Sequence, residues 1–479
     1  MHLVTASPAP INRAQPQRAR LPRHKRLNFL ALVSVIFFTV SGGAYGLEPL
    51  VGAVGAGWAV GLVIVTPILW SLPIALMVAE LSSAMPEEGG YYAWVRNSLG
   101  NFWSVQEGWW TICYTAVDMA IYPVLFVNYF AYFYPQLALD ETGSASWPVM
   151  LTRWLIAVLL IAVALAINWR GASAVGRSAT INVSLVLVPF ALLAISGLAR
   201  EGGAQAAVAA IKHDLANTKE FGLLALGLST VMWNYMGWDN VSTFADEVDD
   251  ATRNYPRALF AALPITIAAY LLPLLAGIAV TTDPAVWNES AGWPVLAQLI
   301  GGKWLGVVVA SAALISAWSL FNSQLLYVSR LPFVMARDGW LPSPLARVSA
   351  ETGVPTTALI ASCVVSALFA ALPFGKLVII DVLLYAAALS LEFAALIWLR
   401  LKRPEMKRPF RVPGGWPSIT LITLAPMCFA AVVLWASFSD ASTDARQAMM
   451  VIAVMASGFA LYFARKRRIH DDNRSAVSE

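Results

Sequence analysis

Long runs of apolar residues, separated by short polar segments, occupy most of the sequence from residue 28 onward. The hydrocarbon core of a bilayer is about 30 Å thick, so a helix needs about 20 apolar residues to cross it. A helix also satisfies its backbone hydrogen bonds within the segment, as a span in lipid requires. These runs therefore predict an all-α integral membrane protein with twelve spans. They lie at residues 28–52, 58–84, 102–134, 150–169, 178–198, 221–245, 257–281, 303–330, 356–374, 377–401, 419–438 and 447–464.

The composition excludes most other classes of protein. Charged residues make up 13% of the chain and hydrophobic residues 58%, whereas soluble domains carry about 25% charged residues. The three cysteines lie in apolar runs and the four histidines lie outside them, so neither residue type indicates a redox centre, a metal site or another cofactor. The one longer external loop, near 199–220, holds no cluster of candidate catalytic groups. We therefore expect no enzyme and no bound cofactor.

The distribution of Lys and Arg predicts the orientation. With the N-terminus inside, 25 of the 32 basic residues lie on the cytosolic side and 7 on the other. Cytosolic loops are enriched in Lys and Arg, so we expect a multi-pass protein of the cell membrane with both termini cytosolic. Residues 1–27 form a polar, disordered tail and not a signal peptide, and residues 465–479 form a second cytosolic tail.

Two of the runs contain residues that disfavour a helix at mid-membrane depth. The first run holds three glycines in Val40–Gly46, and the sixth run holds Asn, Gly and Asp in Trp233–Asn240. The alternative for the glycines is close packing between helices. The two runs are five spans apart, so they cross the membrane in opposite directions. Broken helices at corresponding positions of two inverted halves indicate the substrate site of a transporter.

Two cytosolic motifs then connect the chain to a known family. The sequence Pro86-Glu87-Glu88-Gly89-Gly90-Tyr91-Tyr92 follows the second run, and Ser329-Arg330-Leu331-Pro332 leads to Ala336-Arg337-Asp338-Gly339-Trp340-Leu341-Pro342 after the eighth. In these motifs the chain resembles the amino acid-polyamine-organocation superfamily of transporters. The resemblance implies a leucine-transporter-like fold of five plus five inverted helices with two additional C-terminal helices. The repeats then cover residues 28–198 and 199–402, and the additional helices residues 403–464.

Further motifs resemble the polyamine uptake branch of this superfamily. They are Ser41-Gly42-Gly43 with Gly46 and Glu48, Ile121-Tyr122-Pro123-Val124-Leu125-Phe126, Trp233-Asn234 with Trp238-Asp239, and Leu391-Glu392-Phe393. The resemblance supports a transporter more strongly than it supports one substrate.

Acidic residues inside the apolar runs indicate the charge of the substrate. We count six, and no Lys or Arg lies at a similar mid-membrane depth. An ionised side chain there costs at least about 2.5 to 3.5 kcal/mol, so each must be protonated, hydrated or paired with a cation. An amine substrate supplies such a cation. The six are Glu48, Glu80, Glu107, Asp118, Asp239 and Glu392.

We expect Asp118 and Asp239, with Glu392, to bind the amine. The alternative is that each carboxylate caps a broken helix or accepts from a neighbouring Ser or Tyr. Closely spaced acids also exchange protons readily, which makes Glu48 and Glu392 candidates for proton coupling. The aromatic residues Tyr45, Tyr122, Trp233 and Trp238 are candidates for cation–π contacts with the amine, against the alternative of ordinary packing.

Similar transporters bind the carboxylate of an amino acid on the backbone amides of the broken first helix. Here that implies a role for Ser41, Gly42 and Gly43, whereas a polyamine has no carboxylate and the gap is instead filled by Glu48 or water. Glu80 and Glu107 lie near the cytosolic ends of their runs. We expect both to act in a cytosolic gate, partnered by basic residues such as Arg96 or Arg330.

The sequence as a whole predicts a secondary active transporter, coupled to protons, that imports polyamines or cationic amino acids. Its partners are a small amine or amino acid, a proton and membrane lipid, and we expect neither nucleic acid nor an obligatory protein partner. The alternatives are a neutral or broad amino acid permease of the same superfamily and, from another class, a channel or a membrane enzyme.

Overall fold

The computed structural model describes residues 26–140, 144–217, 219–287, 292–371, 377–439 and 445–478. Every regular element in these ranges is a helix, and Leu27 and Val248 form an isolated β-bridge. Eight helices are long and apolar enough to cross a membrane, so the predicted class of an all-α membrane protein is confirmed. They span Ala56–Ala84, Asn101–Phe130, Trp147–Asn168, Ala172–Leu198, Ala251–Ile278, Lys303–Arg337, Asp381–Lys402 and Gly415–Trp435.

The other four predicted runs form interrupted or differently bounded helices. The first run is divided into α1 and α2, and the sixth into α10 and a 3-10 segment, η4. The ninth run forms the short helix α15, and the twelfth lies within α18, which continues to Ser478. The predicted tail of residues 1–27 lies almost entirely outside the described residues.

The elements of the first half follow the apolar runs closely, with a π-helical turn, η2, inside the second run. Their bounds are α1 Phe29–Val40, α2 Glu48–Val54, α3 Ala56–Thr66, η2 Pro67–Ser71, α4 Leu72–Ala84, α5 Gly90–Leu99, α6 Asn101–Phe130, η3 Pro135–Leu137, α7 Trp147–Asn168, α8 Ala172–Leu198 and α9 Gly203–Leu215.

The second half contains two short helices, α12 and α13, between two long ones. The bounds are α10 Phe221–Asn234, η4 Asn240–Glu247, α11 Ala251–Ile278, α12 Pro284–Trp287, α13 Gly292–Gly301, α14 Lys303–Arg337, η5 Ser343–Ala346, α15 Thr356–Phe369, α16 Leu377–Lys402, α17 Gly415–Ser439 and α18 Ala445–Ser478.

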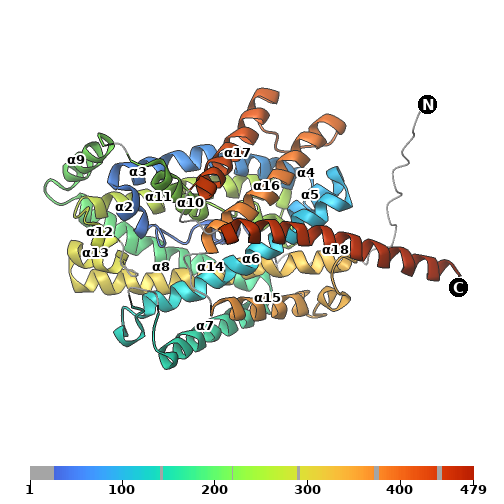
Figure 1. Cartoon of the computed structure of the whole chain (residues 1–479), viewed down its shortest axis with the longest axis horizontal. Helices are drawn as coiled ribbons and strands as arrows, with labels where there is room; N and C mark the ends of the chain where they lie inside the picture. Colours follow the sequence, from blue (N-terminus) through green and yellow to red (C-terminus); the bar gives the residue numbers. More distant parts are fainter. Residues whose placement is uncertain are drawn as a thin grey trace.

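The long helices form one bundle, in which α6 packs against both α14 and α16, while α1 packs against α8 and α11. Apolar side chains such as Leu155 and Ile181 remain exposed on α7 and α8. Such exposure is unfavourable in water and favourable against lipid. Figure 1 shows α9, α12 and α13 gathered at one end of the bundle, whereas the C-terminus of α18 lies at the other end.

Candidate functional site

The break in the first run has a backbone that only glycine adopts without strain. The helix α1 ends at Val40 and α2 begins at Glu48, as the sequence predicts. Between them Gly42 has φ +79°, and an added Cβ at this position would lie 2.6 Å from Leu320 Cδ1. A side chain at Gly42 would therefore strain the backbone and clash with α14.

The backbone amides of the glycines in this break have acceptors within the protein. The Gly42 N–H donates to Phe37 O at 3.3 Å, and the Gly43 N–H donates to Ser41 Oγ at 3.0 Å. Glu48 accepts from the Gly46 N–H at 2.6 Å and from the Tyr129 hydroxyl. The backbone amides that we expected to hold a substrate carboxylate thus already have acceptors, and the Glu48 carboxylate lies in the gap.

The break in the sixth run separates α10 from η4 and exposes further backbone groups. The Tyr270 hydroxyl donates to the carbonyl oxygen of Asn234, the last residue of α10. The Gly237 N–H donates to the Tyr385 hydroxyl at 3.3 Å, and this hydroxyl in turn donates to Asp239. Tyr385 belongs to α16, so a side chain from the tenth predicted run holds the break in the sixth.

Asp118, halfway along α6, is the centre of a first group of polar contacts. The Tyr122 hydroxyl lies 2.9 Å from each of its carboxylate oxygens, and the Trp233 indole N–H donates to Oδ1 at 3.2 Å. The Tyr122 and Trp233 rings are stacked with their centroids 6.4 Å apart. Behind them, Gln324 donates to the Tyr122 hydroxyl. The structure thus brings together three of the predicted site residues.

Our count of acids inside the apolar runs was wrong, because it left out Asp381. This residue lies in the first turns of α16 and is fully buried. It interacts electrostatically with Asp118 and lies beside Trp233. The indole N–H is directed at Asp118, and neither oxygen of Asp381 has a hydrogen-bond partner. Its position in an apolar run is the signal that could have identified it. We call Asp118 and Asp381 the first acidic pair.

A second acidic group lies farther along the same helices. It consists of Asp239 at the break, Glu392 on α16 and Glu107 on α6, and all three are buried. The carboxyl groups of Asp239 and Glu392 are neighbours, and Glu107 interacts electrostatically with both. Two neighbouring buried carboxyl groups can share one proton in a hydrogen bond, whereas two ionised carboxylates only accept and repel each other.

The aromatic residues predicted for the site fall into two sets. Tyr122 and Trp233 contact Asp118, as described above. Tyr45 instead donates to Val309 O at 2.8 Å and packs against Tyr129, and Trp238 is fully buried with its indole N–H unpartnered. Of these four aromatic residues, Tyr122 and Trp233 therefore contact Asp118 directly.

The two acidic groups receive no positive charge from the part of the protein that the structure describes. The ion pairs there join other residues, and no cluster of His, Cys, Asp and Glu has the arrangement of a metal site. Burying a carboxylate without a counter-charge is costly. The two groups are therefore suited to bind cations or protons.

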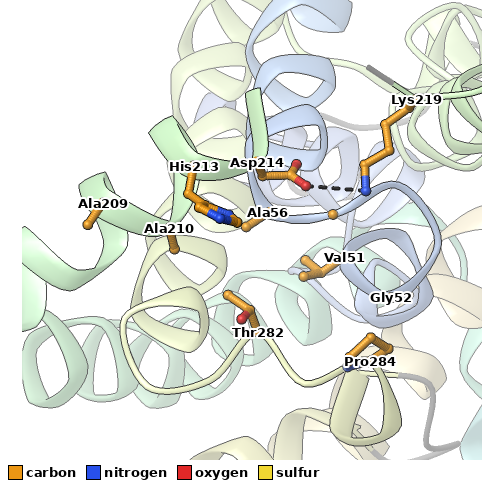
Figure 2. A pocket seen from close by; sticks show the side chains of 11 residues that line it. Val51, Gly52, Ala56, Ala209, Ala210, His213, Asp214, Lys219, Thr282 and Pro284 are labelled. Carbon is orange, nitrogen blue, oxygen red and sulfur yellow. Dashed lines mark ion pairs between the residues drawn. The ribbon is translucent and has the colours of Figure 1, made fainter. Parts of the chain in front are cut away.

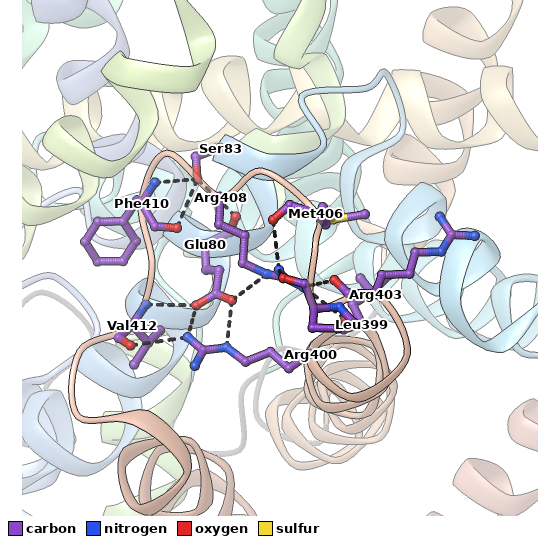
Figure 3. A network of polar contacts seen from close by, with 10 residues as sticks. Glu80, Ser83, Leu399, Arg400, Arg403, Met406, Arg408, Phe410 and Val412 are labelled. Carbon is purple, nitrogen blue, oxygen red and sulfur yellow. Dashed lines mark hydrogen bonds and ion pairs between the residues drawn. The ribbon is translucent and has the colours of Figure 1, made fainter.

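Glu80 has different partners from those we expected. Its carboxylate pairs with Arg400 at the end of α16 and with Arg408 Nε at 3.2 Å, and it accepts from the Val412 N–H at 2.8 Å (Figure 3). Burial lowers the pKa of the Arg408 guanidinium from its ordinary value, and Glu80 opposes this shift. These contacts tie α4 to the segment that follows α16.

The prediction that Arg96 or Arg330 pairs with Glu80 and Glu107 was wrong. Arg330 binds Glu247 through two hydrogen bonds of 2.9 and 3.1 Å, and Arg96 pairs with Asp338. Glu107 accepts from Thr111 at 3.1 Å and belongs to the second acidic group.

A cavity of about 440 Å³ lies away from the acids, among α2, α3 and α9 (Figure 2). Its one carboxylate, Asp214, pairs with Lys219 at 3.3 Å and accepts from the Gly57 N–H at 2.9 Å. This cavity therefore offers a cation no unpaired charge. It is lined by Val51, Gly52, Gly55, Ala56, Ala209, Ala210, His213, Asp214, Lys219, Thr282 and Pro284.

Comparison with known proteins extends over nearly the whole chain. The profile of a family described as amino acid permease matches residues 27–459. The chain is 34% identical over 449 residues to the polyamine transporter PUT1 of Oryza sativa subsp. japonica, with 93% of this chain and 80% of that protein covered. It is 32% identical over 439 residues to the polyamine transporter RMV1 of Arabidopsis thaliana, covering 91% and 84%. An uncharacterized transporter of Mycobacterium tuberculosis is 30% identical over 326 residues, 68% of each chain.

Proposed function

The chain belongs to the amino acid permease family of the amino acid-polyamine-organocation superfamily, whose members are transporters and not enzymes, and from this premise we propose that it imports polyamines. The import is driven by the proton gradient and proceeds by alternating access between the two sides of the cell membrane.

The observation that carries the proposal is the pair of buried acidic groups at the broken helices. Five carboxyl groups lie in these two groups, between α6, α16 and the break before η4. No cationic side chain in the described ranges pairs with them. A polyamine supplies several positive charges on a slender apolar chain. The ammonium groups of such a molecule balance the charge of the buried acids, and its methylene groups pack against apolar side chains. The names of the two plant relatives, both polyamine transporters, agree with this substrate class.

The amino acid alternative requires a binding place for the substrate carboxylate. In the first break, Gly42 and Gly43 donate their N–H groups to Phe37 and Ser41, and Glu48 adds a negative charge nearby. A carboxylate there would compete with existing acceptors and would be repelled by Glu48. The contacts of the first break thus favour an amine without a carboxylate.

We assign the coupling proton to the pair formed by Asp239 and Glu392. These two buried carboxyl groups are neighbours that can share one proton, and Glu392 Oε2 has no hydrogen-bond partner among the described residues. An arriving ammonium group replaces that proton as the positive partner of the two acids, which couples substrate binding to proton movement. Glu48, the other candidate, is already bound by two donors.

The architecture that we propose keeps the twelve spans and their inverted repeat. Residues 28–198 and 199–402 form the two repeats, residues 403–464 add two helices, and both termini face the cytosol. In this orientation the first acidic pair lies toward the outside and the second acidic group toward the cytosol. Glu80 and its arginines lie at the cytosolic end of the bundle, as a gate requires.

The test is uptake of radiolabelled putrescine, spermidine, arginine and a neutral amino acid by proteoliposomes, with and without an inward proton gradient. We expect uptake of the polyamines, stimulated by the gradient and competed little by the amino acids. Protein-free liposomes control for leakage. Uptake of amino acids alone would contradict the proposal and establish an amino acid permease.

A further inference from the structure

Two helices carry the same three residue types at the same spacing in opposite order. On α6, Glu107, Tyr114 and Asp118 are separated by seven and four residues, and on α16, Asp381, Tyr385 and Glu392 are separated by four and seven. Offsets of four, seven and eleven residues return to nearly the same face of a helix. Each helix therefore carries a row on one face that reads acid, tyrosine, acid.

The two rows face each other in antiparallel register. Asp118 interacts electrostatically with Asp381, and Glu107 with Glu392. Between these pairs the rings of Tyr114 and Tyr385 contact each other edge to face, with centroids 5.5 Å apart and an interplanar angle of 87°. The ring contact and the two electrostatic interactions agree with one register, so the arrangement consists of two carboxylate pairs with an aromatic pair between them.

Acceptor atoms remain unused at both ends of these rows. Neither oxygen of Asp381 has a hydrogen-bond partner, and the same holds for one oxygen each of Glu107 and Glu392. The three residues are at most 1% exposed, so these oxygens are shielded from bulk water. Buried carboxylate oxygens without donors are strongly unfavourable, and an ammonium ion offers three donors and a charge.

The spacing of the two pairs sets the length of a ligand that can reach both. Eleven residues at 1.5 Å per residue separate the acids of each helix by about 16 Å along its axis. From ordinary bond lengths, the terminal nitrogens of an extended polyamine lie about 6 Å apart in putrescine, about 11 Å in spermidine and about 16 Å in spermine. With an ammonium group placed just inside each pair, the triamine and the tetraamine span the rows and the diamine does not.

We propose that the rows on α6 and α16 form a two-ended site for an extended triamine or tetraamine, in which Asp381 completes the outer ammonium site with Asp118. The inner ammonium group binds Glu107 and Glu392 together with Asp239. The tyrosine pair lies beside the middle of the chain, where aromatic rings suit methylene groups and a secondary ammonium. This inference rests on the proposed function and adds to it a preference for chain length.

The experiment compares wild-type protein with Asp381→Asn, Asp381→Glu and Asp283→Asn in proteoliposomes. Asp283 is exposed in the segment before α12, so its variant makes the same chemical change outside the rows. For each protein, KM and kcat are measured with putrescine, spermidine and 1,8-diaminooctane, whose terminal nitrogens are as many bonds apart as those of spermidine.

We expect the wild type and Asp283→Asn to have at least a tenfold lower KM for the two long amines than for putrescine. Asp381→Asn should raise the KM for both long amines at least tenfold and leave that for putrescine within about threefold, with kcat changed less than KM. Asp381→Glu should keep most of the preference, because it retains the charge.

The outcomes separate this inference from the proposed function. Uptake of polyamines with equal KM values in wild type and Asp381→Asn overturns only the two-ended site. The two-ended site is also overturned if Asp381→Asn loses stimulation by the proton gradient at unchanged KM, because Asp381 would then carry the proton. A wild type that transports no polyamine overturns the proposed function itself.

If Asp381→Asn does not fold, thermal unfolding of the wild type in detergent replaces the variant. We expect 1,8-diaminooctane and spermidine to raise the unfolding temperature at concentrations about tenfold lower than putrescine does. Equal concentrations for the three amines would overturn the two-ended site.

Discussion

Asp118 has hydrogen-bond donors in the protein but no positively charged partner among the described residues. Tyr122 and Trp233 donate to it and fix its orientation, yet these neutral donors do not balance a full charge in a buried position. The protein thus supplies the orientation of the carboxylate, and in the function that we propose the substrate supplies the balancing charge.

Replacing this residue should weaken substrate binding. An ion pair at about 4 Å is worth about 4 kcal/mol at an effective dielectric constant of about 20, and the Asn side chain retains part of that attraction. We expect Asp118→Asn to raise the KM for spermidine by about 10- to 100-fold in proteoliposomes. Tyr122→Phe, which removes one donor and no charge, should raise it by less than tenfold. Equal transport by Asp118→Asn and wild type would contradict the acidic site.

Glu392 allows a separate test of coupling. Glutamine in its place removes the titrating group while it keeps the shape, so an inward proton gradient should no longer stimulate uptake, whereas exchange of labelled for unlabelled substrate should continue. Glu220→Gln, at an exposed position before α10, should behave as wild type. Persistent stimulation by the gradient in Glu392→Gln would place the coupling proton elsewhere.

At the scale of elements, the two breaks depend on backbone conformations that side chains disfavour. Gly237 has φ +92°, and an added Cβ would lie 2.8 Å from the carbonyl oxygen of Thr39 on α1. The second break therefore approaches α1 directly through backbone atoms, beside the point where α1 ends. The two broken segments therefore approach each other through their backbones, and no single side chain determines this contact.

Alanine at Gly237 should disturb this approach. We expect Gly237→Ala to lower the free energy of unfolding by about 1 to 3 kcal/mol, because of the strained backbone and the clash. Thermal unfolding in detergent measures it, and uptake should fall at the same time. Gly61→Ala, inside α3 with no atom within 4 Å of the added Cβ, should be neutral or slightly stabilising. Equal stability of the two variants would show that the break tolerates a side chain.

Across the whole molecule, contacts between distant parts of the chain hold one end of the bundle. Glu80 and Arg400 are 320 residues apart in sequence, and their contact joins α4 to the end of α16 (Figure 3). Glu247 and Arg330 form a second buried pair between η4 and α14. In the alternating access that we propose, this end opens and closes, so these pairs are suited to stabilise the closed arrangement.

Removing the carboxylate of the first pair should therefore be costly. Glu80→Gln leaves the buried Arg400 and the partly buried Arg408 without their shared counter-charge, for which we expect a loss of about 3 to 5 kcal/mol in unfolding free energy. Glu87→Gln makes the same change at an exposed ion pair with Arg96 and should lose less than about 1 kcal/mol. Thermal unfolding of both variants checks the difference, and similar losses would show that burial of the Glu80 pair adds no stability.

The amino-acid sequence by itself determined that the chain lies in a lipid bilayer, that its fold is all-α, and where its helices break. A run of apolar residues can satisfy its backbone in lipid only as a helix, and glycine or asparagine in such a run weakens it locally, so both properties follow from residues that are neighbours in the chain. The same reasoning identified Asp118, Asp239 and Glu392 as acids at membrane depth.

The tertiary structure alone decided which of these residues meet. It brought Asp381 to Asp118, Tyr385 to Asp239 and Arg400 to Glu80. The register and rotation of packed helices depend on the shapes of side chains far apart in sequence, and one helical turn of slip would pair other residues. The depth of a residue in the membrane is therefore determined by the local sequence, whereas its contacts with residues of other helices are determined by packing.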